Sequence, residues 1–223
     1  MREKRKRRRI FLLKLVVLAL IIYIVIAVFF QVVGSNIRNI VIVDNQYLTD
    51  QEIIDQAGLT DYPSFFESPS FVIRNRLLKD DLIKEVKVRK GWFNKVTITV
   101  TENRPLFMRN ELIVLQDGTE IPSRATISAP ILVNHVPDAI FSDLLIQMGN
   151  LRNNVLRKIS EIEYSPNDID ETRFLLHMTD GNLVYINIST FNKLNRYDSI
   201  LPTLEGKKGI LYLDFGDHFE VRE

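Results

Sequence analysis

The sequence predicts an α+β domain held outside a membrane by a single N-terminal transmembrane helix. Three observations lead to this fold class. A long apolar run follows a basic N-terminus. Two short helix patterns and strict strand alternation follow in residues 37–102, and residues 104–223 contain mainly short strand patterns and hairpin turns.

The N-terminal segment predicts a membrane anchor. Residues 1–13 form a basic tail that includes Arg7, Arg8 and Arg9, and residues 14–34 form the expected transmembrane helix. About 20 mostly apolar residues are enough to cross a hydrocarbon core, and Lys14 is placed to extend its amine to the headgroups. Because basic clusters stay on the cytoplasmic side, we expect a single-pass protein of the cell membrane with its C-terminal domain outside.

The alternative interpretation of this segment is a cleaved signal peptide. The basic start fits one, and Arg8-Arg9 resembles a twin-arginine signal. The apolar core is longer than the 7–15 residues usual in signal peptides, and the only small-x-small site is Val32-Val33-Gly34. A retained anchor is therefore the favoured interpretation.

Charge and cysteine content limit the function classes. Eight of the 29 basic residues and one of the 28 acidic residues lie in positions 1–14, so the remainder carries 21 basic and 27 acidic residues, a net charge of −6. An acidic exported domain argues against nucleic-acid binding. The chain has no cysteine, which removes thiolate catalysis and the common structural zinc sites.

The first part of the exported region predicts the order β-α-α-β-β. Residues 37–43 form a strand, and a helix follows that begins at a Thr49–Glu52 capping box and ends at Gly58. A second helix begins at Ser68-Pro69, and its buried side is expected to contain Phe71, Val72, Leu77 and Leu78. The strands 84–89 and 96–101 alternate apolar with polar residues, so one face of each is packed.

The second part predicts a sheet with helices packed on it. The expected helices cover residues 138–156 and 190–204. The expected strands cover residues 112–115, 131–133, 159–164, 173–179, 183–188 and 210–215, with a short final pairing at 219–221. Asp180-Gly181 is a hairpin turn.

The order and spacing of several stretches resemble the FtsQ/DivIB family of bacterial cell-division proteins. The stretches are Ile40 to Asn45 leading into Thr49-x-x-Glu52-Ile53, Leu82 to Arg89, Val96 to Pro105, Asp117 to Ile121 and Ala129 to Leu132. The resemblance covers essentially the whole chain. The chain departs from the family in two turns, at Asp44-Asn45 and Gly91-Trp92.

The resemblance implies a POTRA domain at residues 37–103 and a bent mixed β domain at residues 104–223. It implies a non-enzymatic scaffold of the division septum that binds FtsB/DivIC-type and FtsL-type membrane proteins, and through them affects septal peptidoglycan synthases. It implies no cofactor, no metal and no small-molecule substrate. A transport component of the POTRA class is the less favoured alternative, because no β-barrel pattern follows.

The last long strand is the candidate partner-binding site. We expect an edge strand there, open to strand addition by another chain. Its residues are Ile210, Leu211, Tyr212, Leu213, Asp214 and Phe215. Arg196 and Tyr197, on the preceding helix, are expected to line the same surface. The alternative is a closing core strand with no partner.

No catalytic constellation is recognisable. His135, His177 and His218 are the only histidines, and none lies at metal-ligand spacing from another. Two further functions stay open on sequence grounds, which are an anchored extracytoplasmic binding domain unrelated to division and an exported cell-wall enzyme.

Overall fold

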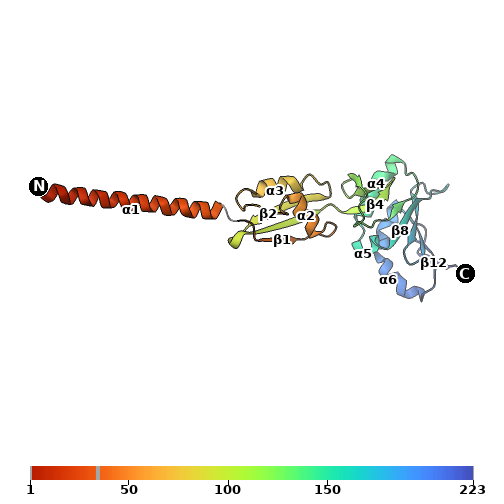
Figure 1. Ribbon diagram of the computed structural model, residues 1–223. Helices are drawn as coiled ribbons and strands as arrows, with labels where there is room; N and C mark the ends of the chain where they lie inside the picture. The colour runs from red at the N-terminus through yellow and green to blue at the C-terminus, as the bar shows by residue number, and fades with distance from the viewer. Residues whose placement is uncertain (1, 34–35, 223) are drawn as a thin grey trace. The chain divides into compact units, whose positions relative to one another are not determined.

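The computed structural model describes residues 2–33 and 36–222. Helix α1 (Arg2–Val33) contains the one candidate membrane span found among the described residues, Leu12–Phe29, with a mean hydropathy of 3.1 (Figure 1). The helix includes the predicted basic tail as well as the apolar run. Lysine, arginine and leucine all favour the helix, so no break separates the two.

The polypeptide divides into two compact units. The first comprises Met1–Lys79 and Glu85–Thr101, and the second comprises Asp80–Lys84 and Glu102–Glu223. The chain passes from the first unit to the second for the last time between Thr101 and Glu102.

The first unit confirms the β-α-α-β-β order. Its elements are β1 (Asn39–Val43), α2 (Asp50–Ala57), α3 (Ser70–Leu77), β2 (Ile83–Lys90), η1 (Trp92–Asn94) and β3 (Lys95–Glu102). The strand order is β1-β3-β2, and β1 runs parallel to the central strand β3. The two helices lie on one face of this sheet (Figure 1).

Local sequence accounts for most of this unit. Val96, Ile98 and Val100 are fully buried, as the alternation predicts. The capping box at Thr49 is formed, and Gly58 ends α2 in the left-handed region with φ 69°. The prediction that Phe71 is buried is wrong, because this side chain is 66% exposed.

The buried residues of α3 are Leu77, as predicted, and Ile73, which was not predicted. Pro69 occupies the N-cap of this helix. Ile73 and Leu77 are four residues apart, so they lie on the same face of the helix and are buried together.

The second unit is a mixed nine-stranded sheet with helices, as predicted. The strand order is β12-β11-β10-β9-β8-β7-β4-β5-β6. The strands are β4 (Pro105–Arg109), β5 (Leu112–Leu115), β6 (Glu120–Pro122), β7 (Ile131–Leu132), β8 (Ile159–Tyr164), β9 (Arg173–Met178), β10 (Leu183–Asn187), β11 (Gly209–Tyr212) and β12 (His218–Val221). Three neighbouring pairs, β10–β11, β4–β7 and β7–β8, are parallel, and the others are antiparallel.

Several predicted boundaries in this unit are wrong. Strands β4 and β6 were not expected. The predicted helix 138–156 is two helices, α4 (Asp138–Gly149) and α5 (Asn153–Leu156). The predicted helix 190–204 is a succession of η2 (Ile188–Arg196), α6 (Tyr197–Ile200) and η3 (Leu201–Leu204), mostly 3₁₀ turns. Asn187 caps its first turn by accepting from the Thr190 amide, and Pro202 enters its last one.

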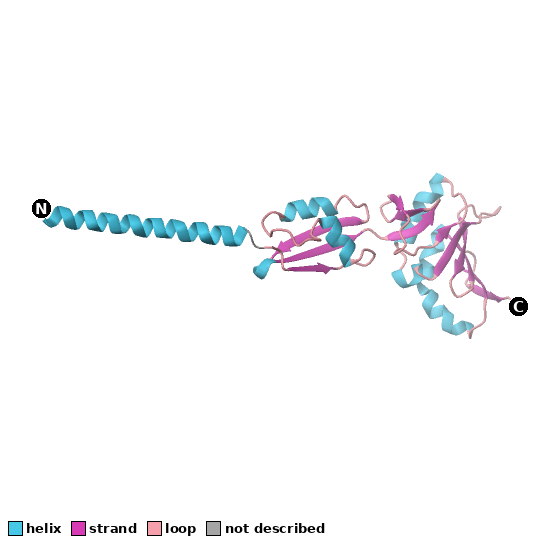
Figure 2. Cartoon of the chain, viewed as in Figure 1, coloured by secondary structure: helices cyan, strands magenta, loops and turns pink. Residues whose placement is uncertain are grey.

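The helical segments cover one face of the sheet and leave the other open to solvent (Figure 2). The core between them contains Phe174, Phe191, Leu194 and Tyr197, all fully buried. Along β9, β10 and β11, alternate residues point into this core, and the intervening ones form the opposite face. The candidate site lies where this sheet ends.

Candidate partner-binding edge

Strand β11 is not the edge strand that the sequence predicted. It lies between β10, to which it is parallel, and β12, to which it is antiparallel. The four pairs with β12 run from Gly209↔Val221 to Tyr212↔His218. A turn with Gly216 at φ 72° returns the chain, so β12 rather than β11 ends the sheet.

The predicted site residues divide between two faces. Leu211 and Leu213 are buried in the core, whereas Ile210, Tyr212 and Asp214 are partly exposed on the opposite face. The strand ends at Tyr212, and Leu213 and Asp214 follow it with amides that donate to the Tyr185 carbonyl over 2.8 and 3.2 Å.

Phe215 belongs to the turn and is 86% exposed. Residues of the strand predicted for 210–215 alternate between the two faces as far as Asp214, and the alternation fails at Phe215, because the backbone has left the strand.

Gly209 allows β12 to approach closely. A Cβ atom at this position would lie 2.0 Å from the Glu220 carbonyl oxygen and 2.8 Å from Cζ of Phe219. The Gly209 amide donates to Oδ1 of the buried Asn182 over 3.0 Å. Only glycine leaves room for the edge strand here.

Stacked side chains connect the open face of β9–β12. The Arg173 guanidinium lies 3.6 Å from the centroid of Tyr185, and the rings of Tyr185 and Tyr212 are 5.4 Å apart. Tyr212 and His218 stack at 4.5 Å with an interplanar angle of 7°.

Polar contacts fix this stack at Arg173, its first member, and at Tyr212. Nε of Arg173 donates to Asp214 over 2.7 Å, and the Tyr212 hydroxyl donates to Glu220 over 3.0 Å. Loss of hydration, reinforced by the Glu220 carboxylate, raises the pKa of Tyr212. Tyr212 thus holds the edge strand in place and stays a protonated donor.

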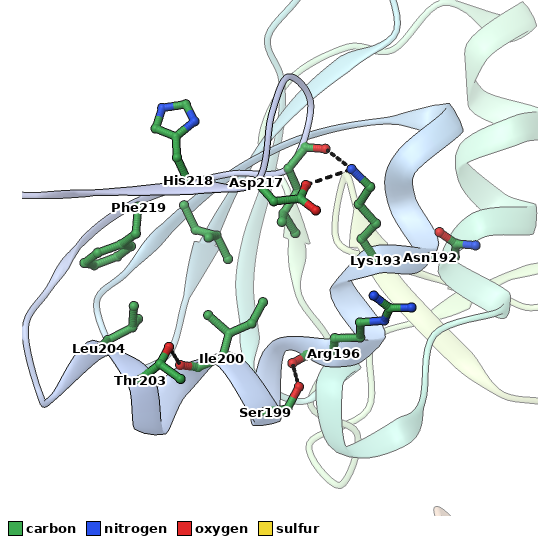
Figure 3. Close-up of a pocket in the computed structure, with 12 residues that line it drawn as sticks. Asn192, Lys193, Arg196, Ser199, Ile200, Thr203, Leu204, Asp217, His218 and Phe219 are labelled. Atoms are coloured by element: carbon green, nitrogen blue, oxygen red, sulfur yellow. Dashed lines mark hydrogen bonds and ion pairs between the residues drawn. The ribbon is translucent and has the colours of Figure 1, made fainter.

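On the other face, a pocket of about 540 Å³ lies between β11–β12 and the η2–η3 segment (Figure 3). Its apolar lining is Ile200, Leu204, Leu211, Leu213 and Phe219. Its polar lining is Asn192, Lys193, Arg196, Ser199, Thr203, Asp217 and His218.

Lys193 closes one side of this pocket. Its amine reaches across to Asp217 at 2.8 Å (Figure 3). In the same view, Phe219 points toward Leu204, whereas the His218 ring points away from both. Arg196 also lines this pocket, and its part in partner binding stays a prediction.

The predicted surface role of Tyr197 is wrong. This side chain is fully buried, its hydroxyl donates to Asp180 over 2.8 Å, and it accepts from the Asn182 amide over 3.1 Å. Burial, followed by the contact with Asp180, raises the pKa of Tyr197. The residue joins α6 to the 180–182 turn from inside the core.

The remaining predicted positions lie outside the candidate edge. The side chains of Arg7, Arg8 and Arg9 are outside the described residues, and Lys14 is exposed on α1. Of the histidines, His177 lies beside Glu161 and Glu163, at 4.0 and 3.7 Å. No group of three His, Asp or Glu side chains within the described part of the chain is arranged to hold a metal ion.

Two domain families match this chain. Residues 35–103 match the FtsQ-type POTRA domain, and residues 107–215 match the C-terminal domain of the cell division protein FtsQ/DivIB. The chain belongs to the FtsQ/DivIB family. Its role is therefore in cell division, and its apolar N-terminal helix fits the architecture of a single-pass membrane protein.

Individual relatives and one solved structure are also similar to this chain. The cell division protein DivIB of Bacillus subtilis (strain 168) is 28% identical over 98% of this chain and 87% of the relative. DivIB of Geobacillus kaustophilus (strain HTA426) is 29% identical over 98% of this chain and 86% of the relative. A solved structure, the major extracytoplasmic domain of DivIB from Geobacillus stearothermophilus, is 26% identical, with a TM-score of 0.38 over 47% of this chain and 96% of that chain.

Proposed function

We propose that this protein is a non-enzymatic scaffold of the division machinery that binds another membrane-anchored division protein along β12. The supporting observation is that β12 ends the nine-stranded order while its inner edge is fully paired with β11. The proposed partner is of the FtsB/DivIC type, bound together with an FtsL-type protein. Through them, the scaffold acts on septal peptidoglycan synthases and concentrates at the division septum.

The backbone of β12 favours strand addition. The Arg222 amide donates to the Lys208 carbonyl over 3.0 Å, so residue 222 points its amide toward β11. In an antiparallel pair this direction alternates, and Phe219 and Val221 therefore point their amides and carbonyls away from β11. These are the groups that an incoming strand would pair with.

The side chains along this edge favour particular residues in the partner. The pocket under Phe219 suits one large apolar side chain, and Arg196 in its lining suits an acidic neighbour. On the opposite face, the stack ends at the exposed ring of His218, which another planar side chain can extend. Strand addition gives affinity through the backbone, and these two features give selectivity.

The decisive experiment compares Val221→Pro with Val221→Thr in the full-length protein. Val221 is 50% exposed, and its amide faces outward, so proline removes a donor for the added strand without removing a bond to β11. We expect Val221→Pro to raise the Kd for the FtsB/DivIC-type extracytoplasmic region about tenfold or more, since a hydrogen bond and steric fit are both lost.

The threonine variant keeps the amide and the branched side chain, and its Kd should match that of the original protein. Equal Kd values for the proline and threonine variants would place the site elsewhere. No binding by the original protein would overturn the partner assignment.

A further inference from the structure

Two large aromatic side chains at the tip of the first unit have no packing role. Trp92 and Phe93, in the turn between β2 and β3, are each 90% exposed. The adjoining loop adds Tyr62 and Phe66, which are 48% and 46% exposed. We call these four residues the aromatic tip. Exposed large apolar side chains gathered at one end of a domain often mark an interaction surface.

The backbone holds this tip in an unfavourable conformation. Phe93 and Asn94 have φ values of 59° and 55°, in the left-handed region that bulky side chains rarely adopt. Such strain costs energy and persists at sites where it has a use. Here it turns both aromatic rings outward, while Val96, the first buried residue of β3, keeps its place in the core.

The aromatic tip lies at the end of the sheet where β1 begins, and Figure 2 shows the short helical turn η1 there. The side-chain amide of Asn94 donates to the Asn36 carbonyl over 2.9 Å, and the Arg38 amide donates to the Asn94 carbonyl over 3.1 Å. The Ile37 amide donates to the Pro63 carbonyl over 3.0 Å, which brings the 62–66 loop to the same end.

The covalent chain keeps this end close to the membrane span. The apolar span ends at Phe29, and α1 continues to Val33. Four helical residues rise roughly 6 Å, and the three further steps to Asn36 reach at most about 11 Å. Asn36 is therefore tethered within about 17 Å of the hydrocarbon boundary, whose headgroup layer is itself roughly 5–8 Å deep. The aromatic tip adjoins Asn36 through the hydrogen bond from Asn94.

The charges around the tip match an anionic surface. Residues 86–101 contain Lys87, Arg89, Lys90 and Lys95 and no acidic residue. Lys90 also donates to the Phe65 carbonyl and lies 4.3 Å from the centroid of the Phe65 ring, which links the tip to the 62–66 loop. The acidic residues that flank that loop are Asp61 and Glu67, and Lys87 pairs with Glu85 at 3.2 Å. The four basic residues still outnumber these three acidic ones, although the exported region as a whole is negative.

From this geometry we infer that the aromatic tip inserts into the headgroup region of the same membrane that α1 spans, and docks the first unit on its surface. Tryptophan suits this interface because its ring is apolar and its N–H is polar. Lysine and arginine around it contact anionic lipid phosphates. A second attachment beside the helix would fix the orientation of the first unit above the bilayer.

The experiment uses the fact that Trp92 is the only tryptophan in the chain. The full-length protein is placed in nanodiscs of phosphatidylglycerol with phosphatidylcholine, and Trp92 fluorescence is compared with and without lipids brominated near the headgroup. We expect blue-shifted emission and about twofold quenching by the brominated lipid, with less quenching in phosphatidylcholine alone.

The matched control moves the fluorophore to the other end of the same strand. In a variant with Trp92→Phe and Thr101→Trp, the new indole is exposed at the far end of β3, roughly 20 Å from the tip, and should not be quenched. A second variant, Phe93→Asn, suits the left-handed backbone but removes an apolar ring, and it should reduce the quenching of Trp92.

Each contrary result would overturn the inference. Emission typical of an indole in water, without quenching, means that the tip stays in solution. Blue-shifted emission without quenching means that protein rather than lipid covers the tip. Equal quenching of both indoles means that contact with lipid is not specific to the tip.

Discussion

Replacing Gly209 by alanine is expected to separate β12 from the sheet. The new Cβ atom would lie 2.0 Å from the Glu220 carbonyl oxygen, against the roughly 3.5 Å of a relaxed contact. The obstacle is backbone, which cannot rotate aside as a flexible side chain would. The strand must therefore move by roughly 1.5 Å or detach.

Both responses cost a similar amount. Overpacking of this kind costs about 1–3 kcal/mol, and the short contact favours the upper end. Detachment instead exposes Phe219, which is partly buried against the core, so the roughly 1.5–3 kcal/mol of a fully buried side chain is an upper limit for this term. We therefore expect the free energy of unfolding of the second unit to fall by about 2–3 kcal/mol.

Denaturant unfolding together with hydrogen exchange of residues 209–222 tests this expectation. Gly91→Ala is the matched control, since Gly91 has φ −120° and the nearest atom to its added Cβ would be 3.9 Å away. That variant should be neutral or more stable by up to about 1 kcal/mol. Unchanged stability and unchanged protection of β12 in Gly209→Ala would refute the close-approach argument, whereas loss of partner binding would link it to the proposed function.

Three further predictions concern single hydrogen-bonded groups. Tyr197→Phe should lower the free energy of unfolding by about 1–2 kcal/mol, because the Asp180 carboxylate loses a donor; equal denaturation midpoints would contradict this. Thr49→Ala should cost about 1 kcal/mol by removing the N-cap of α2, and Thr49→Ser should restore most of it in the same assay. Burial favours the neutral form of Asp170. This effect is outweighed by hydrogen bonds from Thr172 and Asn187 and by the charge of Arg173, so the pKa of Asp170 is lowered. Its contribution is therefore complete above the ordinary value of 3.8 and is lost as the pH falls through the lowered pKa. Acid titration of stability should be less steep in Asp170→Asn, and an identical slope would rule this contribution out.

The first unit was largely predictable from local sequence. The alternation of Val96, Ile98 and Val100 identified the packed face of β3, and the Thr49 capping box and Gly58 identified both ends of α2. These signals act within a few residues, through side-chain periodicity and backbone capping. The misplaced Phe71 shows their limit, because a shift in where α3 begins changes which residues share its buried face.

The candidate edge was predictable only in part. The sequence by itself predicted a strand over residues 210–215 in which Leu211 and Leu213 share one face, since alternation is a local property. That this face points into the core is a property of the folded chain. The tertiary structure decided that β12 closes over this strand and that Tyr197 is buried. Which strand ends a sheet depends on pairing between segments that are distant in the sequence or return after a turn. Forming those pairs costs conformational entropy, and packing across the whole sheet offsets that cost. The space beside Gly209 and the stack from Arg173 to His218 arise from that packing, so only the folded chain defines them.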